Sequence, residues 1–198
     1  MTWVFVAVVV VLLVIIGALL VRQQRSRRLK ADFGPEYDRV ISERGDQRSA
    51  ERELAGRRKR VSEFEIRPLA SAERERYSER WRAAQRTFVD DPVAAVGEAH
   101  VLVQQVMRDR GYPVDEDFEQ RAADVSVDHP GVVENYRAAH SISLKADQGQ
   151  ASTEQLRQAM VHFRALFDDL LAPGDAASAG GDDGRERGAE PQETTRRS

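Results

Sequence analysis

An uncharged run of 19 residues from Trp3 to Val21 is the feature that most constrains how this chain folds. As a helix, the run spans about 28 Å at ~1.5 Å per residue. The hydrocarbon core of a bilayer is roughly 30 Å thick. The run is rich in Val and Ile, but backbone groups in lipid must bond to one another, which favours a helix. We therefore expect residues 1–21 to form a transmembrane helix, with Trp3 as an interfacial membrane anchor.

The charges that flank the run predict its orientation. No charged side chain precedes the run, whereas a basic cluster follows it. The cluster consists of Arg22, Arg25, Arg27, Arg28 and Lys30. The positive-inside rule then predicts a single-pass plasma-membrane protein with its N-terminus outside and its C-terminal part in the cytoplasm. The same five side chains are predicted to contact the membrane surface, at about 1 kcal/mol per residue near anionic headgroups.

A cleaved signal peptide is the alternative interpretation of the N-terminus. Signal peptides have a positive first segment, an apolar stretch of about 7–15 residues and a cleavage site with small residues. Here the first segment is uncharged, the apolar stretch is longer, and Gly17-Ala18-Leu19-Leu20 matches a cleavage site poorly. The sequence favours an uncleaved anchor. An exported cell-envelope protein, released after cleavage, remains an alternative.

Charged residues dominate positions 22–66. Gly34-Pro35 predicts a break that starts a helix, because proline suits the first helical turn and Glu36 complements the helix dipole. From Glu43 to Arg60 the apolar residues thin to Ala50, Leu54 and Ala55. A helix that is polar nearly all round is either a solvated spacer or marginally stable. We therefore predict a frayed helical stalk over 22–66, and its self-association into a homo-oligomer is left open.

Residues 67–172 predict a small helical bundle, so the fold class is all-α. Ser71 is the predicted cap of a helix whose aromatic stripe includes Tyr77 and Trp81. Asp91-Pro92 predicts the start of the next helix and Gly111 its end. Ser152 with Gln155 forms a capping box before the most regular apolar periodicity in the chain. That periodicity comprises Leu156, Ala159, Met160, Phe163, Leu166, Phe167, Leu170 and Leu171. Residues 173–198 carry no large apolar side chain and are predicted to be a disordered tail.

No catalytic, cofactor-binding or metal-binding residue is predicted. Cysteine is absent, which excludes disulfides, thiol catalysis and cysteine-ligated zinc. The four histidines lack the i,i+4 spacing of a helical metal pair; His100 is interpreted as a packed core residue and His129 as part of a cap. The chain also lacks a glycine-rich phosphate loop and a nucleophile motif. The net charge of −3 gives no reason to expect nucleic acid as a partner.

Two charged clusters have structural interpretations. The acidic cluster Asp115, Glu116, Asp117 and Glu119 lacks the glycine of a calcium loop and suits a helix N-terminus. The basic run Arg57-Arg58-Lys59-Arg60 is flanked by glutamates and lacks interleaved aromatic residues. It is predicted to be a solvated charged face, with membrane-surface contact as the second interpretation.

Several stretches resemble an uncharacterised family of small, singly membrane-anchored proteins from high-GC Gram-positive bacteria. The stretches are LKADFGPEYDRV (29–40), FVDDP (88–92), MRDRGYPV (107–114), FEQRAADVSVDHPGVVENY (118–136) and STEQLRQAMVHFRALFDDLL (152–171). Members of that family are usually labelled hypothetical, membrane or secreted proteins. The resemblance implies placement and architecture, and it carries over no activity and no site residue.

The expected function is a non-enzymatic, membrane-tethered helical module that interacts with membrane lipid and with other proteins. Tethering raises the effective concentration of such a module near other membrane components. The rival hypothesis is a ligand-binding or enzymatic bundle whose site forms between helices. Its suspected residues are Glu134, Tyr136, His140 and His162.

Overall fold

The computed structural model describes residues 2–173, without the side chains at positions 2, 5, 7–11, 14 and 18. These residues form eight helices and no strand, so the all-α prediction is confirmed for them. The helices are α1 (Thr2–Phe33), α2 (Pro35–Arg44), α3 (Gln47–Val61), α4 (Ser71–Asp90), α5 (Pro92–Arg110), α6 (Phe118–Asp128), α7 (Val133–Asp147) and α8 (Thr153–Leu171). The predicted disordered tail lies outside the described residues, apart from Pro173.

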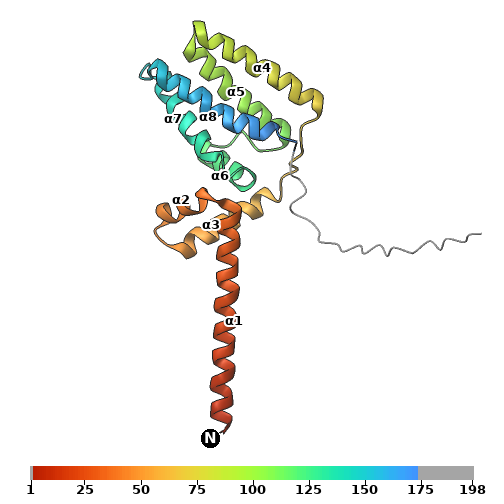
Figure 1. Cartoon of the computed structure of the whole chain (residues 1–198), viewed down its shortest axis with the longest axis vertical. Helices are drawn as coiled ribbons and strands as arrows, with labels where there is room; N and C mark the ends of the chain where they lie inside the picture. The colour runs from red at the N-terminus through yellow and green to blue at the C-terminus, as the bar shows by residue number, and fades with distance from the viewer. Residues whose placement is uncertain (1, 174–198) are drawn as a thin grey trace, which may run out of the picture.

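Helix α1 runs unbroken through the predicted boundary at residue 21 and ends at Phe33. Its N-terminal part projects away from the rest of the molecule (Figure 1). Among the side chains that the structure describes, no helix is long and apolar enough to cross a membrane. The predicted membrane span is therefore not supported by the described residues of α1.

The last two turns of α1 pack with α2 and α3 into a folded N-terminal unit, which we define as residues 26–61 (Figure 1). Its apolar core is small and draws two residues from each helix. These are Leu29, Phe33, Tyr37, Val40, Ala50 and Leu54. The prediction of a frayed stalk was therefore wrong for this segment, because the three helices share one apolar core. The sequence does not show this core, because no single helix has a wide apolar face.

The predicted break at Gly34-Pro35 is confirmed. Gly34 has φ +46°, and Pro35 occupies the first turn of α2. Glu36 does more than complement the helix dipole, because its side chain is buried. It accepts hydrogen bonds from Arg39 and Arg57 of the N-terminal unit and from Arg137 of α7, at 2.6–3.1 Å. Burial alone would raise the pKa of Glu36, but these three guanidinium groups lower it to about 2.

Helices α4, α5, α7 and α8 pack side by side, and α6 lies between them and the N-terminal unit (Figure 1). We call residues 69–171 the bundle. Its core is large and almost wholly apolar, with Phe163 and Tyr136 fully buried and Trp81 stacked on Phe167 at 4.7 Å between ring centroids. This confirms the predicted stripes of the first and last bundle helices.

Local signals at the bundle's helix ends are mostly confirmed. Asp91 accepts a hydrogen bond from the Ala94 N–H, and Ser152 with Gln155 completes the capping box. The predicted cap at Ser71 was one residue late. The cap is Ala70, whose N–H donates to the Glu73 carboxylate at 2.7 Å.

The acidic cluster of residues 115–119 begins α6. Asp117 caps that helix by accepting from the Gln120 N–H at 2.9 Å, and Glu116 pairs with Arg60 of α3 at 2.6 Å. Arg60 also binds the buried carboxylate of Asp124. The cluster therefore supplies a helix cap and a link between α3 and α6. In the described residues no group of three or more potential ligands could hold a metal ion.

Candidate functional site

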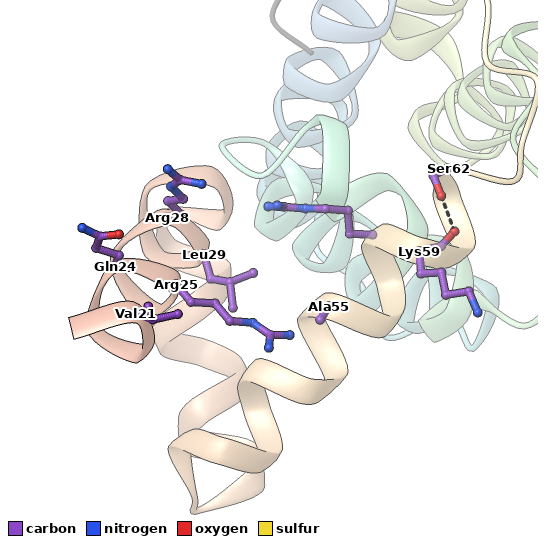
Figure 2. A pocket seen from close by; sticks show the side chains of 9 residues that line it. Val21, Gln24, Arg25, Arg28, Leu29, Ala55, Lys59 and Ser62 are labelled. Atoms are coloured by element: carbon purple, nitrogen blue, oxygen red, sulfur yellow. Dashed lines mark hydrogen bonds between the residues drawn. The ribbon is translucent and has the colours of Figure 1, made fainter. Parts of the chain in front are cut away.

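A pocket with a basic lining forms where α3 crosses α1, just beyond the end of the apolar run (Figure 2). Its volume is about 610 Å³. Helix α1 contributes Val21, Gln24, Arg25, Arg28 and Leu29, and α3 with its C-cap contributes Ala55, Arg58, Lys59 and Ser62. Both sets follow the pattern i, i+3, i+4, i+7, so each set occupies one face of its helix.

The pocket brings together the two basic runs of the sequence. Arg25 and Arg28 come from the cluster that follows the apolar run, and Arg58 and Lys59 come from the run at 57–60. Figure 2 shows the Arg25 side chain reaching from α1 towards α3. The sequence does not show this meeting, because it depends on the turn of α2 that carries α3 back across α1.

Hydrogen bonds between α1, α2 and α3 fix the crossing. The buried Glu51 carboxylate accepts from Ser26 of α1 at 2.5 Å, from Tyr37 of α2 at 3.1 Å and from Gln47 at 2.8 Å. Burial would raise the pKa of Glu51, but these donors outweigh it and the pKa is lowered. Glu51 is therefore a charged acceptor that holds three helices in register beside the pocket.

The pocket's four basic side chains differ in their contacts. Arg58 pairs with Asp32 at 2.5 Å and lies over the Phe33 ring, so its position is set by α1. Arg25, Arg28 and Lys59 are exposed and form no ion pair with another residue that the structure describes. No acidic residue lines the described pocket. The arrangement can bind an anion, and guanidinium groups match the oxygens of phosphate and carboxylate.

The five predicted membrane-surface residues divide into three groups. Arg25 and Arg28 line the pocket, whereas Arg22 and Arg27 are exposed and do not line it. Lys30 pairs with Asp38 of α2 at 3.0 Å. Trp3, the predicted anchor, is 87% exposed near the start of α1.

Of the four residues suspected of forming a site between helices, only Tyr136 and His140 join the same cluster. His162 bonds with Asn135 at 2.8 Å, and Glu134 is an exposed residue beside Arg137. Tyr136 and His140 instead join an aromatic cluster with His100, Phe118 and Phe163. The basic pocket lies elsewhere and contains none of them.

The pKa values of both histidines in the aromatic cluster are lowered, chiefly by burial. His100 stacks on Phe163 at 5.4 Å between ring centroids, which agrees with its interpretation as a packed residue, and its ring contacts the Gln104 amide at 3.0 Å. Burial, together with the nearby charges of His140 and Arg121, lowers the pKa of His100 to about 4. The Tyr136 hydroxyl and His140 Nδ1 are buried and have no hydrogen-bond partner among the described residues.

His129 is the C-cap of α6 and also joins two other helices. Its N–H donates to the Val125 carbonyl, so the cap lies at the end of α6 and not at the start of α7, whose N-cap is Val132. Its ring bonds with Asp169 of α8 at 2.5 Å and lies 3.4 Å from the Arg110 guanidinium. Arg110 in turn donates to the Leu170 carbonyl at 2.9 Å. These contacts tie together the C-terminal ends of α5, α6 and α8.

Comparison with protein-family models, with curated proteins and with solved structures finds no match to this chain.

Proposed function

We propose that this protein is a membrane-tethered, non-enzymatic helical module, in which α1 anchors the N-terminal unit and the bundle to the plasma membrane. The supporting observation is the exposure of α1. Its described large apolar side chains between Trp3 and Val21 are 49% to 87% exposed. Each exposed apolar Å² costs roughly 25 cal/mol in water, so a helix of this composition is stable in an apolar surrounding. The uninterrupted 19-residue run in the sequence has the length of a bilayer core.

The basic residues that follow the run support a cytoplasmic position for the bundle. Five basic side chains lie between Arg22 and Lys30, and no charged side chain precedes Trp3. The positive-inside rule associates this asymmetry with a cytoplasmic C-terminal side.

The continuity of α1 supports a tether with a defined geometry. The helix continues for 12 residues beyond Val21, which is about 18 Å, before Gly34 ends it. Its last turns are part of the N-terminal unit, and that unit is ion-paired to the bundle through Glu36 and Arg137. The bundle would therefore stand at a fixed height above the membrane, where other membrane-bound proteins are its expected partners.

Membrane extraction tests the anchor. In the full-length protein, Leu13→Arg with Ile16→Arg places two charges near the middle of the run, at about 2.5–3.5 kcal/mol each if the run spans a bilayer. We expect the wild-type protein to resist alkaline extraction and this variant to be released. The matched control is Val89→Arg with Val161→Arg, which adds the same charge at exposed positions of the bundle and should stay in the membrane.

A paired reporter fused after Pro173 tests the orientation. A cytoplasmic signal supports the proposal, whereas an exported signal would favour the envelope-protein alternative. Release of the wild-type protein by alkaline extraction would reject the anchor.

A further inference from the structure

We propose that the pocket between α1 and α3 binds the phosphate group of one anionic membrane lipid. The inference rests on the proposed function, in which residues 3–21 lie in the bilayer. It goes beyond a general attraction of basic residues to the membrane, because it assigns one lipid to one pocket with named residues.

The pocket lies at the depth of the lipid phosphates if the apolar run spans the hydrocarbon core. Val21 ends the run and also lines the pocket. Arg25 lies about 6 Å further along the helix axis and Arg28 about 10 Å. The polar layer on each side of a bilayer is roughly 5–8 Å thick. The pocket's basic side chains on α1 are therefore within reach of a phosphate in that layer.

The pocket's chemistry matches a phosphodiester. Three guanidinium groups and one ammonium group line it, and no carboxylate does so within the described chain. Arginine binds two phosphate oxygens at once, whereas lysine contributes a point charge with three donors. The volume of about 610 Å³ is ample for a headgroup.

Apolar lining favours a lipid over free phosphate. Val21, Leu29 and Ala55 line the same pocket as the cations. Leu29 belongs to the core of the N-terminal unit, and Val21 continues into the apolar run. A lipid can place its phosphate on the cations and its glycerol and first methylene groups along this apolar side, whereas inorganic phosphate leaves the apolar side uncovered.

The chain offers a control that separates the pocket from diffuse electrostatic attraction. Arg25→Gln with Lys59→Gln removes one pocket cation from α1 and one from α3. Arg27→Gln with Arg48→Gln removes the same charge from the same two helices, at exposed positions outside the pocket. Arg27 lies about 200° around the helix from Arg25. Arg58 is left intact in both variants, because it pairs with Asp32.

The test is native mass spectrometry of the full-length protein in detergent micelles that contain phosphatidylglycerol or phosphatidylcholine. We expect the wild-type protein to retain one phosphatidylglycerol in preference to phosphatidylcholine. The pocket variant should lose at least tenfold in relative affinity for phosphatidylglycerol, and the control variant should remain within about twofold of wild type. Circular dichroism of each variant checks that the fold is retained.

Three outcomes would overturn the proposal. Equal losses in the two variants would show diffuse attraction, and equal retention by all three proteins would show that the pocket is not the site. Displacement of bound lipid by millimolar inorganic phosphate, without lipid selectivity, would assign the pocket to free phosphate. Alkaline extraction of the same variants is read separately. A pocket variant that stays in the membrane but loses the lipid leaves the anchor proposal intact.

Discussion

The N-terminal unit and the bundle are both all-helical, but different forces hold them together. The bundle buries a continuous set of large apolar side chains from Leu69 to Leu170. The N-terminal unit has an apolar core of only six residues, beside which Glu36 forms ion pairs and Glu51 accepts hydrogen bonds from uncharged donors. Apolar burial is non-directional, whereas charged hydrogen bonds require defined geometry. The bundle should therefore supply most of the stability, and the N-terminal unit should set the orientation between α1 and the bundle.

The largest expected effect is a cavity in the bundle core. Phe167→Ala removes a ring that is 2% exposed and stacked on Trp81. We expect a loss of about 4 kcal/mol in the free energy of unfolding, because large-to-small core substitutions combine lost burial with a cavity. Thermal unfolding of the full-length protein in detergent micelles, followed by circular dichroism, measures the change. Val161→Ala on the same helix is 56% exposed in the wild type and should change little. Similar effects of the two substitutions would contradict a core held by apolar burial.

The next largest effect tests the ion pairs that connect the N-terminal unit to the bundle. Glu36→Gln leaves Arg39, Arg57 and Arg137 without their shared carboxylate. We expect about 3 kcal/mol of destabilisation, since an uncompensated buried charge is costly. Glu43→Gln is the matched control. Glu43 pairs with Arg39 but is 52% exposed, so its loss should cost less than about 1 kcal/mol.

The same pair of variants has a pH signature. The folded-state pKa of Glu36 is about 2 and its ordinary value is 4.5, so its contribution is present above pH 4.5 and lost as the pH falls from 4.5 towards 2. This part of the pH dependence should disappear in Glu36→Gln and persist in Glu43→Gln. If the two variants unfold alike across this range, Glu36 does not join the two regions as described.

The third effect is a pH dependence of the bundle's stability, and it falls at higher pH than that of Glu36. The pKa of His100 falls from 6.5 to about 4, chiefly because burial disfavours the charged ring and also because His140 and Arg121 are nearby. Asp147 opposes this shift. Between these values the unfolded chain binds the proton and the folded chain does not, so stability falls as the pH drops from 6.5 to 4.

His100→Gln removes this titration. For a partly exposed ring the expected loss in the wild type is about 2 kcal/mol, less than the full shift implies. The measurement is thermal unfolding at pH 7 and pH 4.5, where the wild type should lose more stability than the variant. Identical losses would show that His100 does not carry this dependence.

The two regions also differ in how well sequence reasoning predicts them. In the bundle, Asp91, Ser152 and Gly111 are local signals that act on adjacent backbone groups, and the stripe on α8 is long enough to read directly. In the N-terminal unit each helix contributes only two core residues, so no single segment shows an apolar face. Nothing in the sequence around Glu36 and Glu51 indicates burial, although both side chains are buried.

The pocket was missed for a related physical reason. Its residues from α1 and α3 are about 30 positions apart in the chain. They meet only because the chain reverses direction through α2, which brings α3 back across α1. The two basic runs were each visible, and membrane contact was considered for both. Two basic runs in one short charged segment indicate that their side chains could line a common site. Only the crossing of α1 and α3 decides which of those side chains face each other.

The smallest expected effect concerns the linker between the two regions. Gly111 ends α5 with φ +101°, and a Cβ atom there would come within 2.4 Å of the Glu65 carbonyl oxygen. The linker is held at this point by a hydrogen bond from the Arg67 N–H to the Arg110 carbonyl at 2.8 Å. Gly111→Ala should therefore destabilise the protein by about 1–2 kcal/mol, through backbone strain and displacement of the linker.

Gly97 provides a control of opposite sign on the same helix. It is exposed within α5, and a Cβ atom there would meet nothing within 4 Å. Gly97→Ala should raise stability by about 0.5–1 kcal/mol, because alanine loses less backbone entropy than glycine in a helix. At about 2–4 °C per kcal/mol for a chain of this size, the two variants should melt on opposite sides of the wild type. A Gly111→Ala protein that melts with or above Gly97→Ala would show that the linker does not pack on the end of α5, and the join would then rest on the ion pairs alone.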